Sequence, residues 1–140
     1  HWDHIIGFPF FAPLYHTTEH LTIWIPASSP DGGKRLCDEL FTYEFFPVRI
    51  DQLHAKLNYR SAEESAPVRI GPITLHFHRA CHPGVAFVFK IETPYQKIGY
   101  ATDNEFLQGY LGPIDSVPSE LLAKEESLLE FFSDCDLLIH

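Results

Sequence analysis

Three short segments hold most of the side chains in this chain that are able to do chemistry. They are H-W-D-H at residues 1–4, C-H-P-G at 81–84 and Y-A-T-D-N-E at 100–105. Imidazole nitrogens and carboxylate oxygens are ligands that suit zinc and similar divalent ions, and a site that mixes them can leave positions open for water. Each segment lies where a loop meets an expected strand, so a rigid scaffold would hold the ligands. The residue types therefore indicate a metal site.

The strands that would position these segments follow from the hydrophobic pattern. Ile73, Leu75 and Phe77 alternate with polar neighbours, which is typical of a strand with one buried face. Six strands are predicted in all, at 21–25, 55–59, 73–80, 85–92, 97–102 and 136–139. The one at 85–92 is apolar on both faces at its start, as expected for a strand between two layers. We expect the four between residues 55 and 102 to form a β-meander, and 136–139 to be a buried strand.

Helical patterns are fewer. Three helices are predicted, at 5–11, at 34–41 after a turn-rich loop covering 27–33, and at 119–132. The first is apolar and is expected to be buried, whereas the second is expected on the surface. In the third, Ser119 can cap the first turn, Glu120 favours the positive helix start, and Leu121, Leu128 and Phe132 share one face.

Composition and charge narrow the function classes. A chain of 140 residues with 45% hydrophobic residues suits one globular domain. Its net charge is −9 and its ten Lys and Arg residues are scattered, so long nucleic acid is disfavoured as a partner. Metal ions would supply positive charge, which keeps a nucleotide-sized phosphate substrate open. No apolar run reaches the about 20 residues that a membrane helix needs. The three cysteines include no C-x-x-C pair, which indicates reduced thiols and a cytoplasmic location.

The motifs resemble those of a known family. The segment H-W-D-H-I-I-G-F at residues 1–8 resembles the last four residues of the H-x-H-x-D-H signature of metallo-β-lactamase-fold hydrolases, followed by the helix of that signature. H-P-G at 82–84 and Y-A-T-D at 100–103 resemble the next two ligand motifs of the family, in the same order and with strands between them. With D-L-L-I at 136–139 the resemblance spans nearly the whole chain. It is most similar to the phosphodiesterase-like and ribonuclease-Z-like branch.

This resemblance implies an α+β fold, the four-layer αββα sandwich, of which residues 1–140 would form a single partial domain that is incomplete at both ends. It also implies a dinuclear metal site with zinc, or alternatively manganese or iron. His1 and His82 would bind the first ion, Asp3 and His4 the second, and Asp103 would bridge both. Two divalent ions roughly 3.5 to 4 Å apart can activate a water and clamp the oxygens of an in-line displacement. Asp3 would also help to deprotonate that water.

The function implied is metal-dependent hydrolysis of a phosphodiester, such as a cyclic nucleotide or an RNA 3′ end, with a small anionic ester or nucleotide as the partner. Two alternatives stay open. The same ions would polarise the carbonyl of a carboxylic ester, lactone or thioester, and a degenerate member would act only as a binding or sensor domain. Cys81 and Val85 stand where the family usually has Asn and often has Gly, so substrate preference does not transfer. A homodimer also stays open.

Histidines outside these motifs are expected to have other roles. His76 and His78 alternate on one strand and fit a polar sheet face, since no Asp-His follows them. His16 and His20 are expected in an exposed loop, and His140 is not expected to bind metal.

Cys81, Asn104 and Glu105 lie within the motifs but are not among the predicted metal ligands. Cys81 is adjacent to His82, and neighbours on an extended chain point to opposite sides, which disfavours a Cys–His nucleophile pair. Asn104 and Glu105 are able to orient metal ligands from behind, because bound imidazoles commonly donate their second N–H to such groups.

Overall fold

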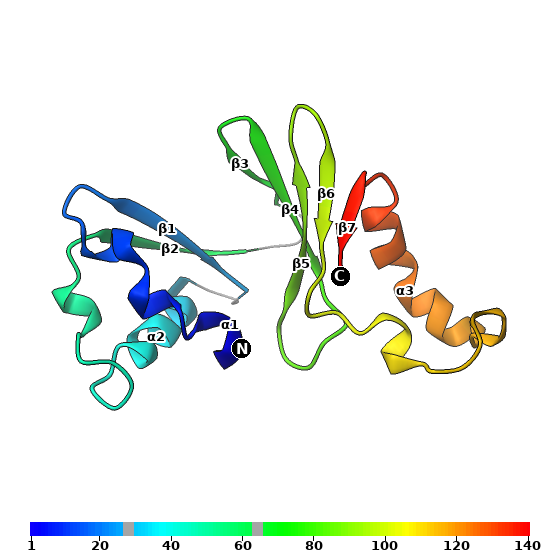
Figure 1. Ribbon diagram of the computed structural model, residues 1–140, viewed down its shortest axis with the longest axis horizontal. Helices are drawn as coiled ribbons and strands as arrows, with labels where there is room; N and C mark the ends of the chain where they lie inside the picture. The colour runs from blue at the N-terminus through cyan, green and yellow to red at the C-terminus, as the bar shows by residue number, and fades with distance from the viewer. Residues whose placement is uncertain (27–29, 63–65) are drawn as a thin grey trace. The chain divides into compact units, whose positions relative to one another are not determined.

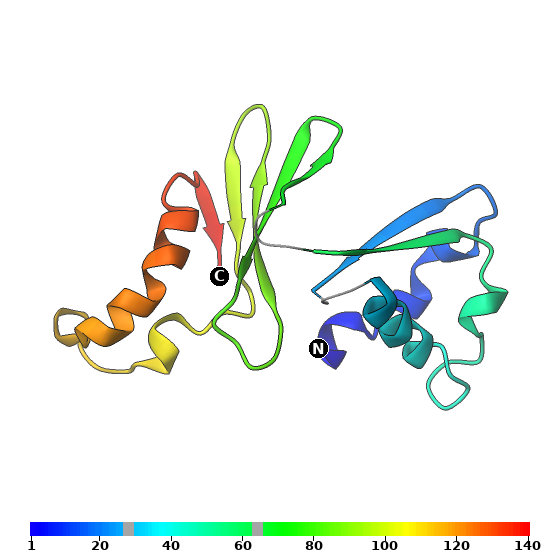
Figure 2. The same ribbon diagram turned by 180° about the vertical axis from the view of Figure 1, so that it is seen from behind.

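The computed structural model describes residues 1–26, 30–62 and 66–140. The chain divides into two compact units, His1–Ala62 and Glu63–His140, which we call the first and the second unit and describe one at a time. Figures 1 and 2 show their elements from opposite sides. The single domain expected over residues 1–140 stays a prediction.

The first unit is built on a pair of parallel strands. β1 (His20–Ile25) pairs with β2 (Lys56–Ser61), and α2 (Pro30–Leu40) connects them. Parallel neighbours need such a crossover connection, so β2 is not part of the β-meander in which we had placed residues 55–59. Both strands alternate exposed and half-buried residues, and their inner sides pack on a core of Leu14, Leu40 and Phe41.

The N-terminal segment differs from the single buried helix expected at 5–11. It forms α1 (Trp2–Ile5) and two short 3₁₀ helices, η1 (Phe8–Phe10) and η2 (Ala12–Tyr15). A proline stands at the start of each 3₁₀ helix, and proline has no N–H for the preceding turn, so one continuous helix cannot form. Burial also differs, because Pro9 and Leu14 are inside whereas Ile5 and Ile6 are exposed.

α2 begins at Pro30, four residues before the expected start. Proline is tolerated in the first turn of a helix, and Asp31 complements the positive helix start there. Gly33 belongs to α2 and is buried, and a Cβ on it would overlap the Ile25 side chain. This glycine therefore lets α2 approach β1 closely. Of the expected loop at 27–33, residues 27–29 lie outside the described part of the chain.

The second unit contains a five-stranded sheet in the order β3-β4-β5-β6-β7. Its strands are β3 (Val68–Ile70), β4 (Ile73–Arg79), β5 (Phe87–Glu92), β6 (Lys97–Tyr100) and β7 (Leu137–Ile139). β3 to β6 are antiparallel neighbours, which confirms the meander for β4, β5 and β6, whereas β7 runs parallel to β6. The short β3 was not predicted.

β7 was expected to be a buried strand, and this expectation was wrong. Leu137, Leu138 and Ile139 are all exposed, between 43% and 52%. The reason is that β7 stands at the end of the strand order, with β6 as its neighbour in this sheet.

One face of this sheet packs against α3 (Ser119–Phe132), which lies beside it in both views (Figures 1 and 2). Leu128 is buried against Ala80, Val88 and Ala101, which come from the ends of three neighbouring strand segments. The opposite face carries aromatic rings in contact, with Phe77 and Phe89 at 5.7 Å between ring centroids and Phe89 and Tyr100 at 6.4 Å. The sheet therefore has a helix-covered face and an aromatic face.

The bounds predicted for α3 are confirmed, and its predicted face is confirmed by the buried Leu128 and the half-buried Leu121 and Phe132. The predicted cap is wrong. Pro118 is the N-cap residue and no side chain caps the helix, because Ser119 already has helical geometry. No helix in the described residues is long and apolar enough to cross a membrane.

We predict that Leu128→Ala lowers the free energy of unfolding by about 2–5 kcal/mol, since it leaves a cavity between α3 and the sheet. Leu129→Ala is the matched control, because Leu129 is the next residue of the same helix and is 53% exposed, against 3% for Leu128. Its effect should stay within about 0.5 kcal/mol. Urea unfolding monitored by circular dichroism measures both, and equal losses would contradict this packing.

A second prediction concerns Cys37, which lies buried on α2 and hydrogen-bonds Tyr59 of β2. Burial, with a smaller contribution from Asp38, raises the pKa of this thiol to about 11. The thiolate is the reactive form, so iodoacetamide at pH 8 should alkylate Cys37 on the order of a hundredfold more slowly in the folded chain than in urea.

The same pKa shift predicts the direction of a pH effect on stability. The unfolded thiol ionises first as the pH rises, so its contribution to stability is present below about pH 9 and is lost towards pH 11.

In the alkylation experiment, mass spectrometry of the alkylated chain identifies the modified cysteine. Equal alkylation rates in the folded and unfolded chain would refute the burial of this thiol.

Candidate metal centre

The directions of three strands explain why separate segments meet at one end of the second unit's sheet. β4 and β6 both run antiparallel to β5, so they run parallel to each other, and β7 runs parallel to β6. The carboxyl ends of β4, β6 and β7 therefore lie at the same end of the sheet. His82 follows β4, Asp103 follows β6, and His140 follows β7.

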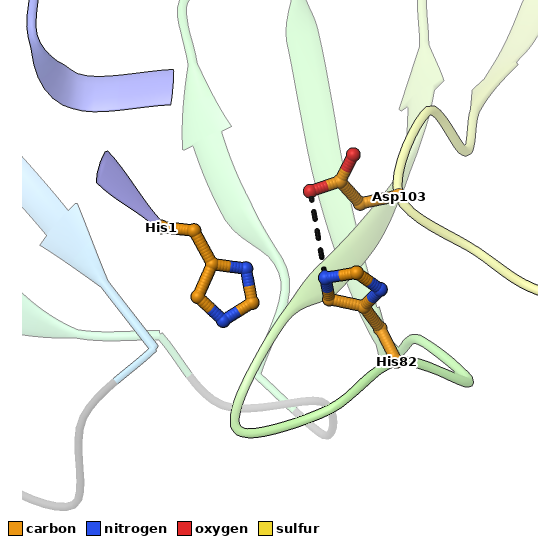
Figure 3. A group of neighbouring side chains, drawn as sticks. All are labelled: His1, His82 and Asp103. Carbon is orange, nitrogen blue, oxygen red and sulfur yellow. Dashed lines mark ion pairs between the residues drawn. The ribbon is translucent and has the colours of Figure 1, made fainter. Parts of the chain in front are cut away.

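His82 and Asp103 face each other at this end (Figure 3). The distance between His82 Nε2 and Asp103 Oδ2 is 3.9 Å, and the two side chains are 24% and 29% exposed. They are thus partly sheltered and still reachable from solvent.

These two side chains fit a shared divalent ion by their chemistry and spacing. An imidazole nitrogen and a carboxylate oxygen bound to one tetrahedral zinc ion lie roughly 3.4 Å apart, given zinc–ligand bonds of about 2.1 Å. The observed 3.9 Å differs from that by an amount that a small side-chain rotation covers. The pair therefore fits two positions in the shell of one ion.

The loops that carry His82 and Asp103 are joined by two hydrogen bonds. The backbone N–H of Cys81 donates to Oδ1 of Asn104 at 2.8 Å, and the N–H of Glu105 donates to the carbonyl of Cys81 at 2.9 Å. Asn104 is 7% exposed. The sequence predicts that Asn104 orients ligands from behind, and the structure gives its side chain a defined partner in Cys81, the residue before His82. Glu105 contributes to this link through its backbone N–H, and the residue is exposed.

The loop after Asp103 also has a strained turn. In η4 (Phe106–Gly109), Leu107 and Gln108 have φ values of 54° and 52°, a left-handed conformation that is uncommon for residues other than glycine. The Leu107 N–H donates at 3.1 Å to Oε1 of Glu125, a residue of α3 that is 3% exposed. This buried carboxylate was not singled out in the sequence, where it resembles the other acidic residues of the helix.

The other three predicted ligands belong to the first unit. His1 is the N-cap residue of α1, and Asp3 and His4 lie within that helix. His4 Nε2 is 3.3 Å from Asp3 Oδ2, with side-chain exposures of 45% and 74%. One short turn thus brings Asp3 and His4 together, while the convergence of all five predicted ligands stays a prediction.

Histidines outside the motifs have protein partners on the sheet. His76 Nε2 lies 3.1 Å from Oε2 of Glu92, and His78 Nε2 lies 2.9 Å from Oγ of Ser127 on α3. The polar sheet face expected for this pair is confirmed. His16 and His20 are exposed, as expected, but His20 is the first residue of β1 and does not lie in a loop.

Comparison with known proteins supports the fold. No family model matches the chain, and no curated protein matches it. Among solved structures it resembles the metallo-β-lactamase fold protein YhfI from Bacillus subtilis, with a TM-score of 0.51 and 15% sequence identity. The similarity covers 95% of this chain and 39% of the YhfI chain. The chain thus has a mixed helix and strand fold similar to that of a metallo-β-lactamase fold protein. The four-layer arrangement and the phosphodiesterase-like branch stay predictions.

Proposed function

We propose that this chain is part of a metal-dependent hydrolase of the metallo-β-lactamase type that acts on a phosphodiester in a small anionic molecule, such as a cyclic nucleotide or an RNA 3′ end. The observation that carries the proposal is the pairing of His82 with Asp103. They belong to two separate motifs, H-P-G and Y-A-T-D, and their ligand atoms lie 3.9 Å apart in a chain with this fold.

In this proposal His1 and His82 would hold one divalent ion, Asp3 and His4 would hold a second, and Asp103 would contribute to holding both, with zinc as the first choice. When bound, such ions lower the pKa of a coordinated water and stabilise the charge that develops during an in-line displacement. Asp3 accepts a proton from the attacking water, and the other four side chains orient the site. The acidic Asp103 and Asp3 suit ions that carry positive charge.

The charge of the chain supports a small anionic substrate. With a net charge of −9, attraction of a phosphodiester has to come from positive charge at the site itself, which two divalent ions provide. A long nucleic acid would instead require a basic surface along its path. We therefore propose a nucleotide-sized substrate and, because the three cysteines include no C-x-x-C pair, a cytoplasmic setting.

We further propose the four-layer αββα sandwich for the single domain. The second unit supports it, because α3 covers one sheet face while the other presents the rings of Phe77, Phe89 and Tyr100. An apolar sheet face is stable when another layer covers it. In the four-layer arrangement that layer is a second sheet.

The double variant His82→Ala, Asp103→Ala tests the site. We expect zinc or manganese content to fall and turnover of bis-p-nitrophenyl phosphate by the full-length protein to drop more than about a hundredfold, since even outer partners of metal ligands cost 10–100-fold. Metal analysis by mass spectrometry and absorbance at the nitrophenolate band provide the readouts.

The chain offers a matched control in His76→Ala, Glu92→Ala. This is also a histidine–carboxylate pair in the same unit, with its atoms 3.1 Å apart, but it lies on the sheet face. This control variant should keep the metal content and the turnover of the wild-type protein. Unchanged turnover in the His82, Asp103 variant would refute the site. Faster cleavage of p-nitrophenyl acetate than of the phosphodiester would refute the substrate class.

Asp3→Asn tests the proposed proton acceptor. The amide keeps the shape of the side chain and removes its basicity, so kcat should fall by about 10²–10⁴-fold. Asp31→Asn is the control, because Asp31 is likewise an exposed acidic residue in the first turn of a helix in the first unit. Steady-state kinetics measure kcat for the two variants. A kcat in Asp3→Asn equal to that in Asp31→Asn would exclude this role.

A further inference from the structure

We propose that Asn104 is a positioning residue of the metal centre. Its side chain ties the loop of His82 to the loop of Asp103, so that the two ligands are held near metal-binding distance before an ion arrives. This inference rests on the proposed function and adds a residue that binds neither metal nor substrate.

The strand order creates the need for such a link. β5 lies between β4 and β6, so these two strands are about 9.6 Å apart, twice the spacing of neighbouring strands, and they have no ladder hydrogen bonds with each other. His82 and Asp103 belong to the loops that follow them. The two loops can meet only beyond the amino end of β5, where hydrogen bonds outside the strand ladder have to join them.

Asn104 provides that replacement next to both ligands. Its Oδ1 accepts the N–H of Cys81, the residue before His82, and Asn104 itself follows Asp103. In the second hydrogen bond Cys81 is the acceptor, since its carbonyl accepts the N–H of Glu105. Each ligand is therefore one residue away from a short hydrogen bond that crosses between the loops.

The residue after a third strand, β7, also contacts Asn104. A ring nitrogen of His140 lies 3.0 Å from the backbone carbonyl of Asn104, and the His140 ring contacts the ring of Phe106 at 4.8 Å between centroids. His140 follows β7, which pairs with β6. The positions of Asn104 and of its neighbour Asp103 are thus fixed by β4, β6 and β7 together.

The burial of Asn104 supports a specific role for its oxygen. Among the described residues its Nδ2 has no hydrogen-bond partner, although the side chain is buried. A buried N–H without a partner is unfavourable, and an apolar residue of similar size would avoid it. Cys81, however, needs an acceptor for its N–H, which leucine would not supply and Oδ1 does.

Asn104→Leu and Asn104→Asp test the inference. Leucine has a similar size and no acceptor, whereas aspartate keeps an oxygen for the Cys81 N–H. In the metal-free protein, hydrogen exchange by NMR should show the Cys81 and Glu105 amides of Asn104→Leu exchanging on the order of ten times faster, with the β4–β5 ladder unchanged. In Asn104→Asp the Cys81 amide should exchange as slowly as in the wild-type protein.

Cobalt binding gives the second readout. Co²⁺ affinity of Asn104→Leu should fall by about 10–100-fold with an altered visible spectrum, while Asn104→Asp should keep the wild-type spectrum. Asp136→Ala is the control, since Asp136 Oδ2 also accepts a backbone N–H across strands, that of Lys97 at 2.8 Å, away from the ligand loops. It should keep full Co²⁺ affinity.

The outcomes separate the two proposals. Wild-type affinity and amide exchange in Asn104→Leu, or an equal loss of Co²⁺ affinity in Asp136→Ala, would overturn the positioning role alone. Failure of the wild-type protein to bind Co²⁺ would overturn the proposed function. Unaltered ladder exchange in each variant shows that the fold is intact, so neither result can be attributed to unfolding.

Discussion

The antiparallel pairing of β5 with both of its neighbours is the constraint on which the candidate centre depends. It gives β4 and β6 the same direction and so brings the loops that follow them to one end of the sheet. β7 adds its own carboxyl end beside them. Without this arrangement His82 and Asp103, which are separated by two strands along the chain, would have no reason to approach within 3.9 Å.

Two lysines of the second unit's sheet, Lys90 and Lys97, interact with nearby carboxylates. Lys97 Nζ and Lys90 Nζ lie 2.6 and 2.9 Å from the carboxylate of Asp134, and these hydrogen bonds hold the pKa of Asp134 well below its usual range. Lys97 also lies 3.9 Å from Glu92. Asp134, just after the end of α3, thus interacts with both lysines, and Glu92 of β5 is a second acidic neighbour of Lys97.

Local patterns predicted much of the second unit and less of the first. Period-2 alternation located β4, short strand-like stretches between turns located β5 and β6, and the amphipathic pattern located α3, because each signal spans a long enough segment. β3 has only three residues and gave no such signal. In the first unit, Pro9 and Pro13 interrupt an apolar run that otherwise resembles a helix. The partner of β2 was missed because pairing direction depends on a distant strand.

By itself the sequence determined the residue types of the centre, the order of its three motifs and the strands that flank them. Those features are local, since ligand chemistry and side-chain periodicity are properties of short segments. The resemblance of the motifs implied that Asp103 and His82 share an ion, but tertiary structure alone decided that their side chains lie 3.9 Å apart without one and that Asn104 joins their loops at 2.8 Å. Strand direction and the choice of a hydrogen-bond acceptor depend on residues far apart in the chain, so no local pattern specifies them.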